Sequence, residues 1–151
     1  AIRWGEDPEN AAEAAILHDI GVFIRYDNHN LHSHYIIRNS EIFGLSRMDN
    51  TIVAEIAKYH KGSLVPQDDE TYQMMPRPDR MTILKLTAIL RIADALDRGH
   101  IQKFTDFTMK LQQNNLIISA KNNPNTVLER IALAEKAGMF ESVFGYKVIL
   151  L

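Results

Sequence analysis

The chain has 151 residues, of which 46% are hydrophobic and 24% charged, an ordinary composition for a globular protein with a sizeable core. Its 17 lysines and arginines against 19 aspartates and glutamates leave a net charge of -2, which excludes a general basic field for nucleic acid or for an anionic membrane. The absence of cysteine excludes disulfides and thiolate ligands, no apolar run is long enough to span a bilayer, and we therefore expect a cytoplasmic protein.

The first predicted helix covers residues 7–20. Asp7-Pro8 offers an N-cap and a proline in the first turn, which are both typical of a helix start, and Gly21 supplies the stop. The adjacent pair His18-Asp19 therefore falls at the carboxyl end of this helix.

A loop is predicted over residues 22–32, because this segment contains the turn-forming pair Asp27-Asn28. Ser33 can then cap a short helix that runs to Arg38. Three histidines, at positions 29, 32 and 34, cluster where the loop meets this helix.

The next helix is predicted from a capping box. Ser46 and Asp49 have the required spacing, and the apolar residues after them follow one helical face to His60, with Gly62 just beyond. Residues 63–78 contain three prolines and a run of acidic residues, which predict a surface loop or lid.

A central helix is predicted over residues 79–97, which are apolar nearly all round. Asp94 lies among its aliphatic residues, where an unpaired buried carboxylate would cost several kcal/mol or take up a proton. Arg91 and Arg98, three residues before and four after, are within salt-bridge range on a helix and offer one form of compensation. A cation shared with the His18-Asp19 pair offers the other, because imidazole and carboxylate ligands give the mixed shell that divalent ions accept.

The hydrophobic period changes in the last third of the chain. Residues 107–111 and 116–118 alternate between apolar and polar around the turn Asn114-Asn115, which predicts a β-hairpin. A capping-box pattern opens a helix over residues 126–138, and residues 146–151 alternate like a third strand.

These elements predict an α+β chain with two domains, a mostly helical one over residues 1–103 and a small ββαβ one over residues 104–151. The chain begins without methionine and ends on the apolar segment Val148–Leu151, so we expect it to be cut from a longer protein.

Several segments together resemble known phosphohydrolases. The sequence His18-Asp19-Ile20-Gly21, the helix-ending His60 and the segment Ile92–Asp97 resemble the HD superfamily of metal-dependent phosphohydrolases, which has an all-helical fold. More narrowly, the chain looks like the carboxyl-terminal region of the exopolyphosphatase and guanosine pentaphosphate phosphatase family, on segments 15–21, 32–40, 58–61 and 89–98. That resemblance implies a small mixed domain after the HD-like part. It also implies that an actin-like amino-terminal domain of the parent protein performs the hydrolysis, and nothing in these residues looks like one.

The HD resemblance implies a divalent metal such as Mg, Mn or Zn on His18, Asp19 and Asp94, which would then be catalytic. HD enzymes take a further ligand from a histidine upstream of the His-Asp pair, and residues 1–17 contain none. His34 or His60 could fill the gap only if the fold brings it close. With this incomplete shell, we expect no metal in this chain and a hydrogen-bond network instead.

A second group of residues predicts anion binding. Imidazole, guanidinium and ammonium groups can donate charge-assisted hydrogen bonds to phosphate oxygens, although the same residues could simply lie in a solvated loop. The predicted ligand-binding residues are His32, His34, Arg38, His60, Lys61 and Arg91, with His29 beside them.

Two functions remain open from the sequence. The favoured one is an accessory domain of an exopolyphosphatase-type hydrolase, which binds polyphosphate or a phosphorylated nucleotide, or joins two protomers into a homodimer, for its parent phosphatase domain. The alternative is a metal-dependent HD phosphohydrolase in its own right, acting on a nucleotide or alarmone phosphate.

Overall fold

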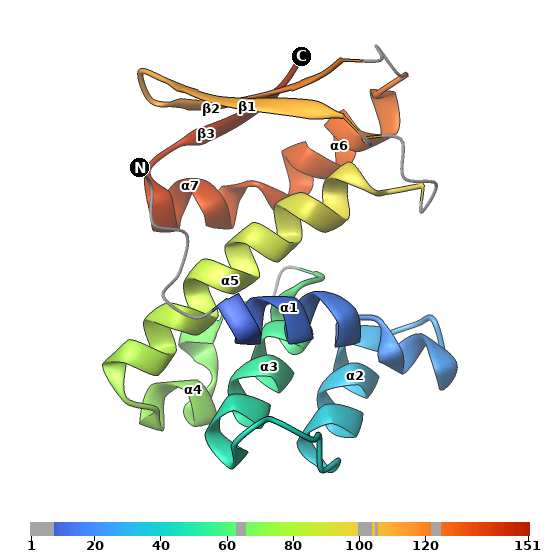
Figure 1. Ribbon diagram of the computed structural model, residues 1–151, viewed down its shortest axis with the longest axis vertical. Coiled ribbons are helices and arrows are strands. Elements are labelled where there is room, and N and C mark those ends of the chain that lie inside the picture. Colours follow the sequence, from blue (N-terminus) through green and yellow to red (C-terminus); the bar gives the residue numbers. More distant parts are fainter. Residues whose placement is uncertain (1–7, 63–65, 100–103, 105, 122–124) are drawn as a thin grey trace. The chain divides into compact units, whose positions relative to one another are not determined.

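The computed structural model describes residues 8–62, 66–99, 104, 106–121 and 125–151. This part of the chain is mostly helical with one three-stranded sheet near its carboxyl end, which confirms the α+β class (Figure 1). In chain order, its helices and strands are α1 (Pro8–Leu17), η1 (Ile20–Phe23), α2 (His29–Arg38), α3 (Arg47–Tyr59), η2 (Pro66–Asp68), α4 (Glu70–Met74), α5 (Arg77–Leu96), β1 (Phe107–Gln112), β2 (Asn115–Ala120), α6 (Val127–Lys136), α7 (Gly138–Phe144) and β3 (Lys147–Leu150).

The chain divides into two compact units, residues 1–87 and residues 88–151, which we call the first and the second unit. The division falls within α5, whose last turns belong to the second unit. The domain boundary predicted near residue 103 lies further along the chain and stays a prediction.

In the first unit, α3 packs against both α1 and α2 (Figure 1). The predicted capping box is confirmed, because the Ser46 side chain accepts a hydrogen bond from the Asp49 N–H and the Asp49 side chain accepts one from the Ser46 N–H. The helix then buries an almost continuous run of side chains, Ile52 to Ala57, and ends at His60. Burial of this apolar surface is what holds the three helices together.

The predicted start of α2 at Ser33 is wrong. The helix begins at His29, because Asn28 takes a left-handed conformation with φ of 54° and reverses the chain there. Ser33 lies buried inside the helix and its Oγ accepts a hydrogen bond from the N–H of Gly21, at 2.8 Å. The predicted loop over residues 22–32 therefore contains part of η1 and the first turn of α2.

The irregular loop predicted over residues 63–78 is also partly wrong. Residues 63–65 lie outside the described residues, but η2 and the short helix α4 occupy most of the rest. Asp69 starts α4, because its side chain accepts hydrogen bonds from the N–H groups of Thr71 and Tyr72.

The second unit contains the sheet, in the order β1-β2-β3. Strands β1 and β2 pair antiparallel with Gln112 opposite Asn115, so the turn consists of Gln113 and Asn114, one residue earlier than predicted. Strand β3 pairs parallel with β2. The predicted single helix between them is two helices, because α7 begins at Gly138, where we expected the helix to end.

The core of the second unit joins the sheet to three helices. It consists of buried residues from α5, β2, α6, α7 and β3: Ala88, Ile92, Ala95, Leu116, Ile118, Ala132, Leu133, Phe140 and Leu150. Among the described residues, no helix combines the length and the apolar character needed to cross a membrane.

Candidate functional site

Four side chains gather in the first unit where α1 ends, α2 begins and α3 ends. His18 and Asp19 follow α1, His29 is the first residue of α2, and His60 is the residue after α3. His29 and His60 are buried, whereas His18 and Asp19 are half-buried. We call His18, Asp19, His29 and His60 the histidine cluster.

Gly21 allows the two segments of the cluster to approach one another. A Cβ atom at this position would lie 2.2 Å from the carbonyl oxygen of His29 and 2.3 Å from the nitrogen of Ser33, so only a glycine fits. The close approach of η1 to α2 brings Asp19 beside His29.

The polar atoms of the cluster lie within hydrogen-bond or ion-pair distance. Asp19 Oδ1 is 3.0 Å from His29 Nε2 and 3.4 Å from His60 Nε2, and these two nitrogens are 3.2 Å apart. His18 Nε2 lies 3.4 Å from Asp19 Oδ2. Ligand atoms of His18, Asp19 and His60 all lie within 4.8 Å of one another, so these residues could hold a metal ion.

The environment favours the ionised form of Asp19. Its hydrogen bond with His60 lowers its pKa well below the ordinary value, against the opposing effect of burial, and the neighbouring histidines lower it further. Burial lowers the pKa of His29, and the nearby Lys61 adds to this effect. The cluster therefore contains the ionised carboxylate of Asp19 beside the imidazole of His29, whose lowered pKa disfavours its protonation.

Two of the three predicted metal ligands lie together, because His18 and Asp19 are both in the cluster. The third, Asp94, belongs to the second unit, where its carboxylate forms an ion pair with Lys136 of α6. Both side chains are 13% exposed. A lysine from another helix, which sequence spacing could not reveal, thus compensates the mid-helix carboxylate.

Of the two histidines that could complete the metal shell, the structure brings only one to the His18-Asp19 pair. His60 lies in the cluster, whereas His34 binds Glu55 through Nε2 and Oε1, 2.9 Å apart. Glu55 is buried at 1% exposure, and its second oxygen has no hydrogen-bond partner among the described residues.

The other predicted ligand-binding residues are dispersed. Lys61 Nζ lies over the ring of Tyr26, 4.6 Å from its centroid, and His32 is half-buried on α2. Arg91 lies in the second unit at 6% exposure, and burial lowers its pKa.

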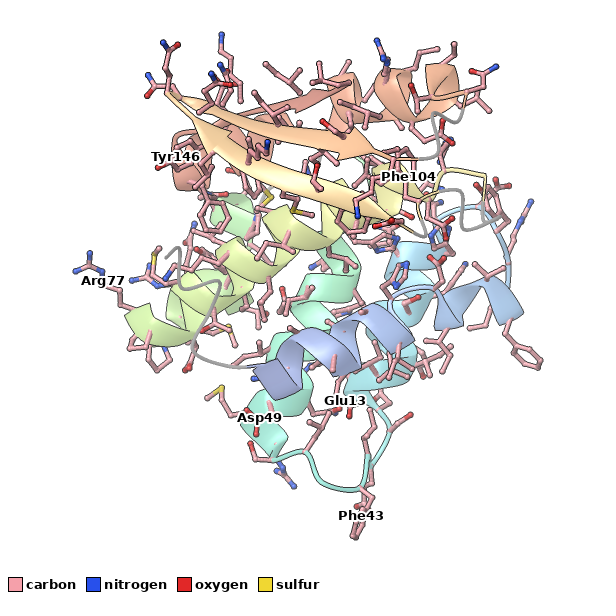
Figure 2. All side chains as sticks on the ribbon, turned by 45° about the horizontal axis from the view of Figure 1, so that its top comes forward. Glu13, Phe43, Asp49, Arg77, Phe104 and Tyr146 are labelled. Atoms are coloured by element: carbon pink, nitrogen blue, oxygen red, sulfur yellow. The ribbon has the colours of Figure 1, made fainter. Side chains whose placement is uncertain are left out.

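A separate open cleft of about 1010 Å³ lies between the carboxyl end of α2 and the start of α3. The sequence identified two of its residues, His34 and Arg38, but not Arg47 or Asn50, which carry no motif. Phe43 at the rim points away from the molecule and is fully exposed (Figure 2). The lining residues are His34, Tyr35, Arg38, Asn39, Ser40, Glu41, Ile42, Phe43, Leu45, Ser46, Arg47 and Asn50.

Comparison with known proteins adds two findings. Residues 3–137 match the family described as Ppx/GppA phosphatase, domain III. A stretch of 50 residues is 38% identical to a guanosine-5'-triphosphate,3'-diphosphate pyrophosphatase of Pseudoalteromonas translucida (strain TAC 125). This stretch covers 33% of the chain and spans only 10% of that relative. Because the family match covers most of the sequence, the chain belongs to the Ppx/GppA phosphatase family, in which it corresponds to domain III.

Proposed function

We propose that the chain is an accessory domain of a phosphoric-anhydride hydrolase, which binds a phosphorylated polyanion for an active site held by another, actin-like domain of the same protein. Polyphosphate and guanosine polyphosphates are the proposed ligands. The family supports this class of substrate. A cytoplasmic location and a homodimer belong to the same proposal.

The observation that carries the proposal is the cleft between α2 and α3. Arg38 and Arg47 are exposed at its wall, and His34, which also lines it, pairs with the buried Glu55. Arg38 is held in place by a hydrogen bond from Nη1 to Thr51 Oγ1, at 2.6 Å. Guanidinium groups bind phosphate oxygens through paired hydrogen bonds, so two of them along one cleft suit a chain of phosphates.

Titration calorimetry with polyphosphate of defined length tests the proposal. We expect the double variant Arg38→Gln, Arg47→Gln to bind at least about 10-fold more weakly than the wild-type chain, because each lost cation removes one charge-assisted contact. Added salt should weaken wild-type binding, because it screens exposed charges.

Arg77→Gln is the matched control for this experiment. Arg77 is an exposed arginine at the start of α5 and lies outside the cleft (Figure 2). Equal losses per removed positive charge in the control and the double variant would show that polyphosphate binding only follows net charge. Wild-type binding that is absent at low salt would leave protomer assembly as the role of the chain.

Assembly is supported by apolar side chains on the surface of the first unit. Ile16 of α1 is 73% exposed and Phe23 of η1 is 93% exposed. Ile20, Val22 and Ile24, close to Phe23 in the sequence, are exposed as well, and contiguous apolar patches are typical of surfaces that bind another protein. Sedimentation velocity of the wild-type chain and of Phe23→Ser tests this role, because a dimer that persists unchanged in the variant does not use this surface.

Metal-dependent phosphohydrolysis is the second candidate, and the close approach of His18, Asp19 and His60 favours it. A divalent ion at these residues would polarise a water molecule for attack on phosphorus. This function would need Asp94 as a further ligand. Phosphate release from guanosine pentaphosphate should then be lost in Asp94→Asn.

Lys136→Met separates the ligand role of Asp94 from its ion pair. Both variants break the pair between Asp94 and Lys136, but only Asp94→Asn removes the carboxylate. Turnover that falls equally in the two variants, or that is absent from the wild-type chain with Mg, Mn and Zn, excludes this function.

A further inference from the structure

Strand β3 forms one edge of the sheet in the second unit. It has β2 on one side, and no strand of the described residues pairs with its other side (Figure 1). The N–H groups of Lys147 and Leu151 donate hydrogen bonds to carbonyl oxygens on the β2 side, at 3.0 and 2.9 Å. Because backbone groups alternate in direction along a strand, Val148 and Leu150 turn their N–H and C=O groups away from β2. These two residues thus present two donors and two acceptors at the outer edge.

A cleft of about 500 Å³ lies against this edge, between β3 and the corner where α6 meets α7. Part of its lining is apolar, because Leu133 and Ala137 face it together with Val148 and Leu150. A Cβ atom built on Gly138, at the start of α7, would have no other atom within 4 Å, so the corner is open. The backbone groups at the edge of β3 therefore border a hollow that can take apolar side chains.

The charged side chains at this cleft are Arg130, Glu141 and Lys147, and all three are exposed. Within the part of the chain that the structure describes, neither Arg130 nor Lys147 forms an ion pair with a carboxylate. Arg130 donates from Nε to Thr126 Oγ1 at 3.0 Å, which holds the guanidinium group in place. Two cations against one carboxylate favour an acidic ligand.

We propose that the outer edge of β3 binds an extended peptide segment with acidic and apolar side chains, as an added strand of the sheet. Such strand addition takes its affinity from backbone hydrogen bonds and its specificity from pockets for alternate side chains. Every second side chain of the added strand shares the face of Val148 and Leu150 and enters the cleft toward Leu133. A carboxylate opposite Lys147 forms a cross-strand ion pair.

A polyphosphate chain fits this cleft less well than a peptide does. Its ionised oxygens offer no hydrogen-bond donor to the carbonyl groups of Val148 and Leu150, and it has no apolar group to cover Leu133. The cleft also lies wholly in the second unit, whereas the cleft between α2 and α3 lies in the first. The inference is therefore independent of the proposed polyanion binding and goes beyond it.

A phage-displayed library of random 12-residue peptides, selected on the immobilised wild-type chain, provides the probe. We expect enriched peptides with apolar residues at alternate positions and at least one acidic residue. The most enriched peptide is then synthesised with a fluorescent label, and fluorescence anisotropy measures its affinity. Val148→Pro should weaken binding at least about 10-fold, because proline removes an N–H that faces the outer edge but none that pairs with β2.

Met109→Pro is the matched control, because it makes the same change at the other edge of the sheet. The N–H of Lys121 donates to the carbonyl of Asp106 at 3.1 Å, and by alternation from this pair Met109 turns its N–H away from β2. Peptide affinity should equal that of the wild-type chain. A loss in Met109→Pro without one in Val148→Pro would move the added strand to β1 and overturn the proposal.

A pair of lysine variants tests the acidic side chain. Lys147→Gln should weaken peptide binding roughly 3-fold, because an exposed cross-strand ion pair is lost. Lys110→Gln removes an exposed lysine of β1, outside the cleft, and should leave the affinity unchanged. Equal losses in the two variants would mean that the peptide only follows net charge, which contradicts the proposed pairing.

Three further results would overturn the proposal. The first is a selection that enriches no peptide. The second is binding of polyphosphate that Lys147→Gln weakens and Lys110→Gln does not, because the cleft would then hold a polyanion. The third is a wild-type dimer that sedimentation velocity shows as a monomer in Val148→Pro, because a second copy would then occupy the edge.

If Val148→Pro does not fold, methylation of the peptide's backbone nitrogens, one at a time, decides the matter on the wild-type chain. An added strand points every second N–H toward β3, so affinity should fall at alternate positions only. Losses without this period of two would exclude strand addition.

Discussion

At the scale of single residues, Gly21 has no room for a side chain. A Cβ atom there would come within 3.0 Å of backbone atoms of both His29 and Ser33, and backbone cannot move aside as a flexible side chain can. We predict that Gly21→Ala lowers the free energy of unfolding by about 1–3 kcal/mol, the usual cost of overpacking, and separates Asp19 from His29. Urea denaturation followed by circular dichroism measures the loss.

Gly138→Ala provides the matched control. No atom lies within 4 Å of a Cβ built at this first position of α7, and alanine favours helix more than glycine does. Its stability should equal or slightly exceed that of the wild-type chain. Similar losses of stability in the two variants would show that the contacts with His29 and Ser33 are not the cause of the loss in Gly21→Ala.

Asp69 uses both carboxylate oxygens. Oδ2 accepts hydrogen bonds from Lys58 and, at 2.6 Å, from the hydroxyl of Tyr59, while Oδ1 accepts from the N–H of Thr71 at 2.8 Å. Burial opposes ionisation, but the hydrogen bonds from Lys58 and Tyr59 outweigh it and lower the pKa of Asp69 from 3.8 to about 2.

The low pKa of Asp69 makes the free energy of unfolding depend on pH in the acidic range. The unfolded chain takes up a proton at Asp69 near pH 4, whereas the folded chain takes it up only near pH 2, so the stabilisation is fully present above about pH 4 and is lost as the pH falls through about 2. Its size is about 2 kcal/mol. Asp69→Asn should lower the free energy of unfolding at pH 7 and flatten its dependence on pH between 4 and 2.

Asp68→Asn tests whether this effect belongs to position 69. Asp68 is an exposed carboxylate next to Asp69 in the sequence. Denaturant titrations from about pH 2 to pH 7 should show a curve close to wild type for this variant. A parallel loss in both variants would assign the effect to general charge in this segment.

Helices α3 and α6 begin with the same sequence pattern but not with the same structure. At α3 the Asp49 N–H donates to Ser46 Oγ at 3.1 Å, and the box is closed on both sides. At α6 the side chain of Thr126 makes no capping hydrogen bond, and Arg130 donates to it through Nε at 3.0 Å instead. The pattern therefore predicts a helix start in both cases, but a capping bond in only one.

The closed box predicts a measurable stability effect. Ser46→Ala should lower the free energy of unfolding by about 1 kcal/mol, because an N–H at the start of α3 loses its acceptor. Ser142→Ala makes the same substitution on α7, where the hydroxyl donates to the carbonyl of Gly138 and no N–H depends on it. Chemical denaturation of both variants should show a loss only in the first, and a loss in both would make the capping bond irrelevant.

Across the chain, sequence patterns correctly predicted the elements that form through interactions between residues close in sequence. The capping box at Ser46, the apolar period of α5 and the alternation around the hairpin turn each involve residues close in sequence, and the structure contains all three elements. The pairing of His18 with Asp19 likewise follows from adjacency.

Features that depend on distant residues could not be predicted in this way. His29 enters the cluster because Asn28 adopts a left-handed conformation. Many residues of the predicted loop could have adopted that conformation, so the sequence does not indicate which one does. Lys136 meets Asp94 across 42 positions of sequence. The cleft at Arg47 forms from the packing of two helices, and no spacing encodes it.

The same dependence on distant residues decides which fragment can fold. The core of the second unit takes Ala88, Ile92 and Ala95 from α5, so a fragment that starts at residue 104 lacks one wall of that core. We predict that residues 104–151 alone show no cooperative thermal transition, because so short a chain cannot bury enough apolar surface without the helix. Residues 77–151, which contain all of α5, should unfold cooperatively by circular dichroism.

Ile92→Asp in the longer fragment tests whether the core contribution of α5 is what makes residues 77–151 fold cooperatively. Ile92 is 5% exposed in that core, and an aspartate there would place an unpaired charge among apolar side chains. The substituted fragment should therefore behave like residues 104–151, whereas Ala93→Asp, at an exposed position of the same helix, should keep the transition. Cooperative unfolding of residues 104–151 by themselves would instead place the domain boundary at residue 103, where the change of hydrophobic period predicts it.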